Sequence, residues 1–220
     1  MVRRVGRAMV VIAFSVLVCG GWISGALASE RGARKTQSTS RVYLMTGMFG
    51  VTSGLDGLAM QLQDQGGLPS KTSAPGGWPA FATEAIAEYK SGRARSIILV
   101  GYSAGGGAAI DMAQALNAEH VPVALLIVID GVGRGPVPPN VRKLLNYYVA
   151  DGISSAMSRQ RGTLQNIAVA GAGHFSLIAA KQAELFRRVM EASRGGSVQP
   201  SSFQTPPSAS ASASGPTRQQ

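Results

Sequence analysis

A serine stands in the pentapeptide Gly-Tyr-Ser-Ala-Gly, residues 101–105, between an apolar run at 96–100 and a segment of helical character. A serine hydroxyl is a poor nucleophile in water, and a tight strand-to-helix turn can lift it out of the backbone toward a base. Such a turn crowds its flanks, so it needs small residues there; Gly106 and Gly107 exceed that requirement. The order of strand, serine turn and helix predicts that Ser103 is an activated nucleophile.

The base must come from one of two histidines. His174 lies in Gly-His-Phe, directly after a predicted strand at 166–170 and before the last predicted helix. The carboxyl ends of parallel strands share one edge of a sheet, so we expect His174 near Ser103. His120 follows the helix after the serine turn, at the opposite edge, where a histidine caps a helix or adds surface polarity. His174 is therefore the predicted base.

The acid that orients such a histidine has two candidates, each at the end of a predicted strand. Asp130 ends the apolar strand 122–129, where a buried charge is costly unless it has a partner such as His174. Asp151 follows strand 143–149 in an Ala-Asp-Gly turn, where an exposed aspartate is ordinary. We favour Asp130, with Asp151 as the runner-up. Asp111, within the helix after Ser103, is expected to point away from this edge.

An oxyanion hole requires two backbone N–H groups aimed at the reacting carbonyl oxygen. The Ala104 N–H, at the start of the helix after Ser103, is one predicted donor. Met48 follows Gly47 in the loop after the first predicted strand, and its N–H is the second.

Strands and helices are predicted to alternate along the folded part of the chain. The predicted strands are 42–46, 68–74 (a weak edge strand), 96–100, 122–129, 143–149 and 166–170. The predicted helices are 55–65, 79–89, 104–118 and 175–191, the last with Leu177, Ile178, Leu185, Val189 and Met190 as its apolar face. This alternation predicts an α/β fold with a parallel sheet.

The order of these motifs resembles the α/β-hydrolase superfamily over residues 41–194. Val-Ile-Asp-Gly-Val at 128–132 and Asn-Tyr-Tyr at 146–148 look like small bacterial lipase-like or thioesterase-like hydrolases. The resemblance implies a minimal three-layer fold with a mostly parallel central sheet and no large lid. It also implies Ser103 as nucleophile, His174 as base and the Ala104 N–H as oxyanion donor.

The expected activity is that of a serine hydrolase, which cleaves an ester or thioester through a Ser-His-Asp triad and an acyl-enzyme. Without a lid, we expect short or exposed acyl groups. The alternative is a catalytically inactive binding or scaffold protein of the cell envelope. Acyl transfer to an alcohol is not separable from hydrolysis by sequence. The chain carries no metal-binding cluster or phosphate loop, so we expect no cofactor and no metal.

The two ends differ in composition from the predicted domain at 41–194. Residues 1–28 have a basic start, an apolar stretch and a final Ala-Leu-Ala, and so predict a signal peptide. An uncleaved membrane anchor is the alternative. Residues 29–40 form a polar linker, and the Ser-, Ala- and Pro-rich residues 195–220 a disordered tail. We expect an exported protein, periplasmic or secreted, without a disulfide, because Cys19 is the single cysteine.

The formal net charge is +10, but the basic residues are scattered. Because no dense basic run alternates with aromatic residues, we expect no nucleic-acid partner. The expected partner is a small acyl ester or thioester, with loose attraction to an anionic envelope surface. The sequence leaves the oligomeric state open.

Overall fold

The computed structural model describes residues 39–132, 135–149, 154–158 and 161–195. They belong to one compact unit, Gln37–Gln220. The predicted signal peptide, most of the linker, Asp151 and the tail beyond Gly195 lie outside the described residues. Within the described residues, every helix is too short or too polar to cross a lipid bilayer.

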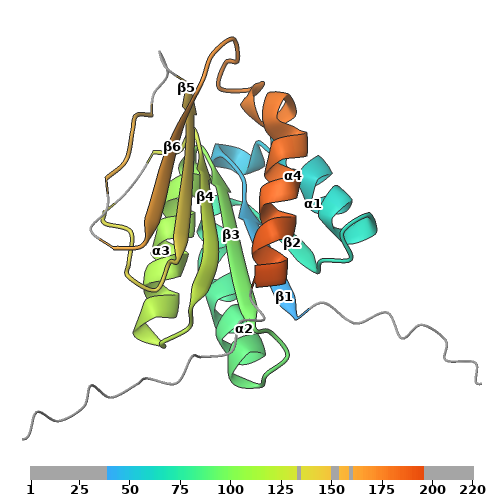
Figure 1. Cartoon of the computed structure of the whole chain (residues 1–220), viewed down its shortest axis with the longest axis vertical. Helices are drawn as coiled ribbons and strands as arrows, with labels where there is room; N and C mark the ends of the chain where they lie inside the picture. Colours follow the sequence, from blue (N-terminus) through green and yellow to red (C-terminus); the bar gives the residue numbers. More distant parts are fainter. Residues whose placement is uncertain (1–38, 133–134, 150–153, 159–160, 196–220) are drawn as a thin grey trace, which may run out of the picture. The chain divides into compact units, whose positions relative to one another are not determined.

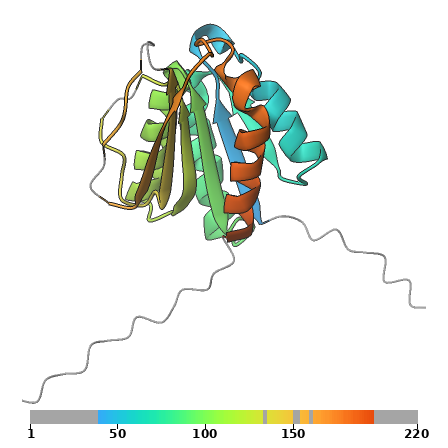
Figure 2. The same cartoon turned by 45° about the horizontal axis from the view of Figure 1, so that its top comes forward.

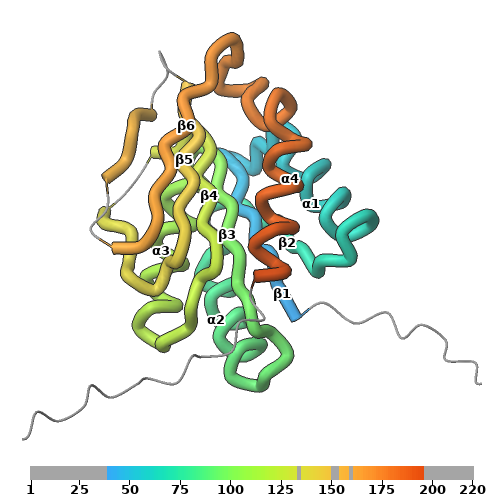
Figure 3. Tube along the Cα trace, viewed as in Figure 1, coloured from blue at the N-terminus to red at the C-terminus, as the bar shows by residue number. Residues whose placement is uncertain are grey.

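A six-stranded sheet in the order β2-β1-β3-β4-β5-β6 forms the centre of the unit (Figure 1). The strands are β1 (Ser40–Met45), β2 (Ser70–Ser73), β3 (Ser96–Tyr102), β4 (Val123–Ile129), β5 (Lys143–Val149) and β6 (Thr163–Val169). Every neighbouring pair is parallel. The tube in Figure 3 shows β3 inside the sheet, with β1 and β4 on its two sides.

Helices cover both faces of the sheet, because successive side chains of its central strands point to opposite faces and are apolar on both. The side chains of Val42 and Leu44 pack on the face that carries α1 (Leu55–Asp64) and α4 (Leu177–Gly195). Those of Tyr43 and Met45 pack on the face that carries α2 (Trp78–Lys90) and α3 (Ala104–Ala118). The chain has the predicted three-layer α/β architecture.

The predicted elements agree with the observed ones to within a few residues, and the predicted bounds of α3 and β5 match those observed. The structure extends β3 to Tyr102, immediately before Ser103, and starts β6 three residues earlier than predicted. Most of β6 is exposed at the edge of the sheet, so the polar sequence at its start gave no sign of the first three residues of the strand. Four predicted apolar residues of α4 are buried, and Met190 is half-buried.

The carboxyl ends of the six strands form one edge of the sheet, called here the carboxyl edge, and their starts form the amino edge. Two short 3-10 helices follow strands at the carboxyl edge, η1 (Met48–Gly50) after β1 and η2 (Pro75–Gly77) after β2. Figure 2 tips this edge forward and shows η1 and the segment before α4 at the same end. The described residues of the β4–β5 and β5–β6 connections form no helix.

Candidate active site

The predicted nucleophile Ser103 lies in the turn between β3 and α3 with φ 54° and ψ −122°. A backbone conformation of this kind costs a residue other than glycine about 1–3 kcal/mol and persists only where its surroundings hold it. Three backbone hydrogen bonds hold it here. Its N–H donates to the Ile129 carbonyl at 3.0 Å, and its own carbonyl accepts from the N–H groups of Gly106 at 2.9 Å and of Val132 at 3.3 Å. The turn is therefore fixed to the end of β4.

Glycine is required at three positions around Ser103 by close packing of backbone on backbone. A Cβ at Gly101 would collide with the Gly105 carbonyl, and one at Gly105 would collide with the carbonyls of Met45 and Thr46. A Cβ at Gly106 would lie 2.9 Å from the Gly131 Cα. The expectation that Gly106 exceeds the requirement for small residues around the serine turn is thus wrong. Glycine is needed there because α3 starts against the ends of both β1 and β4.

The predicted base and the favoured acid contact each other. His174 Nδ1 and Asp130 Oδ2 are 2.6 Å apart, and Asp130 is fully buried while a quarter of the His174 side chain is exposed. The His174 ring stacks on Tyr102, the residue before Ser103, with the ring centroids 4.9 Å apart. His174 therefore lies beside the serine turn. Among the described residues, no hydrogen bond joins the Ser103 hydroxyl to this ring.

Tyr102 holds the segment that carries His174. Its hydroxyl donates to the His174 carbonyl at 3.1 Å and accepts from Ser53 Oγ at 3.0 Å. Burial raises the pKa of the Tyr102 phenol and the charge of Asp130 acts in the same direction, whereas the Ser53 hydrogen bond opposes them. The phenol thus stays protonated and keeps its donor role. Sequence reasoning did not identify this role of Tyr102, because the end of an apolar strand gives no sign of a contact with a residue far along the chain.

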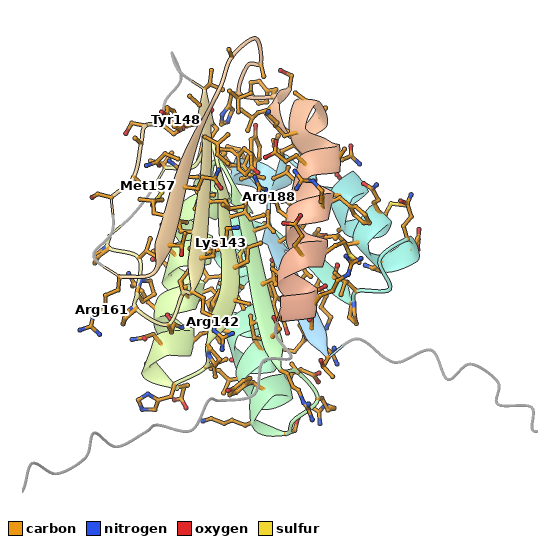
Figure 4. All side chains as sticks on the ribbon, viewed as in Figure 1. Arg142, Lys143, Tyr148, Met157, Arg161 and Arg188 are labelled. Atoms are coloured by element: carbon orange, nitrogen blue, oxygen red, sulfur yellow. The ribbon has the colours of Figure 1, made fainter. Side chains whose placement is uncertain are left out.

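The second oxygen of Asp130 also has partners. The Ser154 hydroxyl donates to Asp130 Oδ1, and the Val149 N–H lies 3.4 Å from the same atom. Asn146 and Asn166 tie residues 154–158 to β5 and β6, through hydrogen bonds to the backbone of Ser155 and of Met157. Figure 4 labels Met157 beside these strands. Ser154 carries no spacing signal relative to Asp130, so the sequence did not single it out.

The two predicted oxyanion donors line one cavity of about 590 Å³. The N–H groups of Met48 and Ala104 have no hydrogen-bond acceptor among the described residues. Gly105 brings them together, since it lets the start of α3 approach the end of β1. Both N–H groups are thus free to bind an oxygen atom.

The rest of the cavity wall is mainly apolar, with Phe49, Trp78 and Ala108 among its residues. Asp111 is the one ionisable residue in that wall. The expectation that Asp111 points away from this edge is wrong. Seven residues make about two helical turns, so Asp111 returns to the face of α3 that carries Ala104.

The remaining predicted residues lie apart from this site. His120 is exposed with φ 58° at the end of α3, on the amino edge as expected. Asp151 lies outside the described residues, so the preference for Asp130 rests on its contact with His174. No group of three or more His, Cys, Asp or Glu side chains among the described residues could hold a metal ion.

Comparisons with known proteins identify the fold. No protein-family model matches the chain, and no curated protein is significantly similar to it in sequence. Human thioesterase 2 superposes with a TM-score of 0.51 at 12% identity, over 74% of this chain and 99% of that one. The type II thioesterase BorB from the borrelidin biosynthetic cluster superposes with a TM-score of 0.53 at 11% identity, over 70% and 91%. The chain has the α/β-hydrolase-like fold that the sequence predicted, and it shares this fold with these two thioesterases.

Proposed function

We propose that this protein is a serine hydrolase that cleaves an ester or thioester through Ser103, His174 and Asp130. One observation carries the proposal: the His174 ring is held between the buried Asp130 carboxylate and Tyr102, next to the strained Ser103. A carboxylate on Nδ1 fixes the tautomer in which Nε2 is free to accept a proton. The thioesterases that share the fold support the same reaction class.

The reaction follows from these positions. As Ser103 Oγ attacks the carbonyl carbon, its proton passes to His174 Nε2 and the carbonyl oxygen becomes an oxyanion. The Met48 and Ala104 N–H groups donate to that oxyanion. His174 then gives its proton to the departing alcohol or thiol, which leaves the acyl group on Ser103. Water, deprotonated by His174, then attacks the acyl-enzyme, and His174 returns that proton to Ser103 Oγ as the acid is released.

The experiment measures p-nitrophenyl butyrate and butyryl thioester hydrolysis together with labelling by a fluorophosphonate. We expect labelling and turnover in the unmodified protein, and loss of both in Ser103→Ala. Ser91→Ala is the matched control, because Ser91 is an exposed serine at the amino edge. Turnover or labelling that survives Ser103→Ala overturns the assignment. A folded protein that neither turns over nor labels is the inactive envelope-binding protein instead.

We also propose that the reaction takes place outside the cytoplasm, in the periplasm or beyond. Residues 1–28 support this by their basic start, apolar stretch and Ala-Leu-Ala end. Cell fractionation and the N-terminal sequence of the mature protein test it. A cytoplasmic protein that retains Met1 contradicts it.

A further inference from the structure

The cavity beside the predicted oxyanion donors combines three kinds of group. Met48 and Ala104 line it next to the serine turn, Phe49 and Trp78 contribute aromatic rings, and Asp111 contributes a carboxylate. We propose that this cavity binds the acyl part of the substrate, and that this acyl chain carries a cationic group, such as an ammonium, that pairs with Asp111. The inference rests on the proposed function and names its substrate class.

The acyl part, rather than the leaving group, belongs in this cavity. The histidine that protonates the leaving group must lie beside it. His174 contacts Tyr102 and Asp130 and is not part of the cavity wall. With the carbonyl oxygen on the Met48 and Ala104 N–H groups, the substituent that extends away from His174 enters the cavity.

The charge of the cavity favours a cationic end. Asp111 is half-buried, and its carboxylate forms no hydrogen bond or ion pair with the described residues. A carboxylate in mainly apolar surroundings gains from a cation, and repels a second carboxylate. The half-buried Trp78 in the same wall adds cation–π attraction for an ammonium group. A plain alkyl chain would use neither feature.

The distance along α3 from Ala104 to Asp111 sets the length of the acyl chain. Asp111 follows Ala104 by seven residues, which is about 10 Å along the axis of α3. With C–C bonds of about 1.5 Å, an extended chain of roughly eight atoms covers that distance. The cavity thus favours a medium-length acyl chain, in place of the short one expected from the sequence.

Binding to the Ser103→Ala protein tests this without turnover. The two probes are methyl ω-aminooctanoate and methyl nonanoate, which differ by an ammonium in place of a methyl group. Calorimetry should find about tenfold tighter binding of the amino ester. A second substitution, Asp111→Asn, should remove this preference. Asp56→Asn, which removes an exposed carboxylate of α1 outside the cavity, should preserve it.

Equal binding of the two probes overturns the inference, and so does a preference that survives Asp111→Asn. Hydrolysis of p-nitrophenyl butyrate by the protein with Ser103 intact keeps the two proposals distinct. Turnover of this ester together with equal binding of the two probes defeats the cationic site alone. Absence of all turnover defeats the proposed function, while an Asp111-dependent preference in the binding assay still supports the cationic site.

Discussion

The carboxyl edge and the amino edge of the sheet are held together by different contacts. Of the described residues other than glycine that have positive φ, four lie at the carboxyl edge: Phe49, Ser53, Ser103 and Asp130. Its histidine–carboxylate pair is buried on the Asp130 side. Phe49 there is 97% exposed, and Met48, Val51 and Phe175 are also exposed. The strained backbone and the exposed apolar side chains at this edge therefore lower the stability of the fold, and they give the edge its geometry and its apolar surface.

The amino edge follows ordinary rules of protein surfaces. Lys90 pairs with Glu119 where α2 and α3 end, and Arg41 and Arg93 both pair with Glu88. Figure 4 shows Arg142 and Lys143 toward this edge and Tyr148 toward the other. The Lys90–Glu119 pair is exposed and so contributes little to stability, whereas the side chains of Arg41 and Glu88 are mostly buried. On the present proposals, function is therefore concentrated at the carboxyl edge.

The largest expected effect is on turnover, in Asp130→Asn. An amide in place of the carboxylate removes the negative partner of His174 Nδ1 and allows the wrong tautomer. We expect kcat/KM for p-nitrophenyl butyrate to fall roughly 10³- to 10⁴-fold with the fold retained by circular dichroism. Glu88→Gln, the same change at the amino edge, should leave kcat/KM within twofold. A fall of less than tenfold in Asp130→Asn means that another acid orients the histidine.

The next largest effect is on stability, in Gly105→Ala. The added methyl group collides with the Met45 and Thr46 carbonyls, which are backbone and yield only if α3 moves. We expect the free energy of unfolding in urea to fall by about 3 kcal/mol. Gly57→Ala is the control, because a Cβ there meets Gln182 at 3.9 Å and Gly57 is exposed within α1. That variant should gain roughly 0.5–1 kcal/mol. Equal effects at the two positions contradict the close approach.

These two changes show what the sequence could and could not predict. The glycine pattern and the strand ends predicted Ser103, His174 and Asp130 at one edge, because parallel strands leave little choice of where their carboxyl ends lie. Their catalytic roles stay predictions. The roles of Tyr102 and Ser154 were missed and Asp111 was placed wrongly, because their surroundings depend on how strands and helices pack. The contact of Tyr102 with His174, for example, joins residues 72 apart in the chain.

A smaller effect on turnover is expected from Ser154→Ala. Ser154 positions the Asp130 carboxylate from the side opposite His174. Loss of one hydrogen bond to a charged group should lower kcat/KM about tenfold, with the change in kcat rather than KM. Ser154→Thr keeps the hydroxyl and should restore most of the rate. Ser155→Ala is the control, since the hydrogen bond of Ser155 to Asn146 uses its backbone carbonyl. A change in KM alone argues against positioning of Asp130.

The smallest effect is expected at the amino edge, in Lys90→Gln. The hydrogen bond and positive charge of Lys90 lower the pKa of the Glu119 carboxyl below its ordinary value. A depressed carboxyl pKa adds stability above the pKa of the unfolded chain, and this contribution is lost as the pH falls below about 4. Melting temperatures of the two proteins should therefore differ slightly at pH 7, less at high salt, and not at all in strong acid. A difference that persists in acid means that Lys90 acts through the packing of its aliphatic stem, and the amino edge then depends on more than exposed charge pairs.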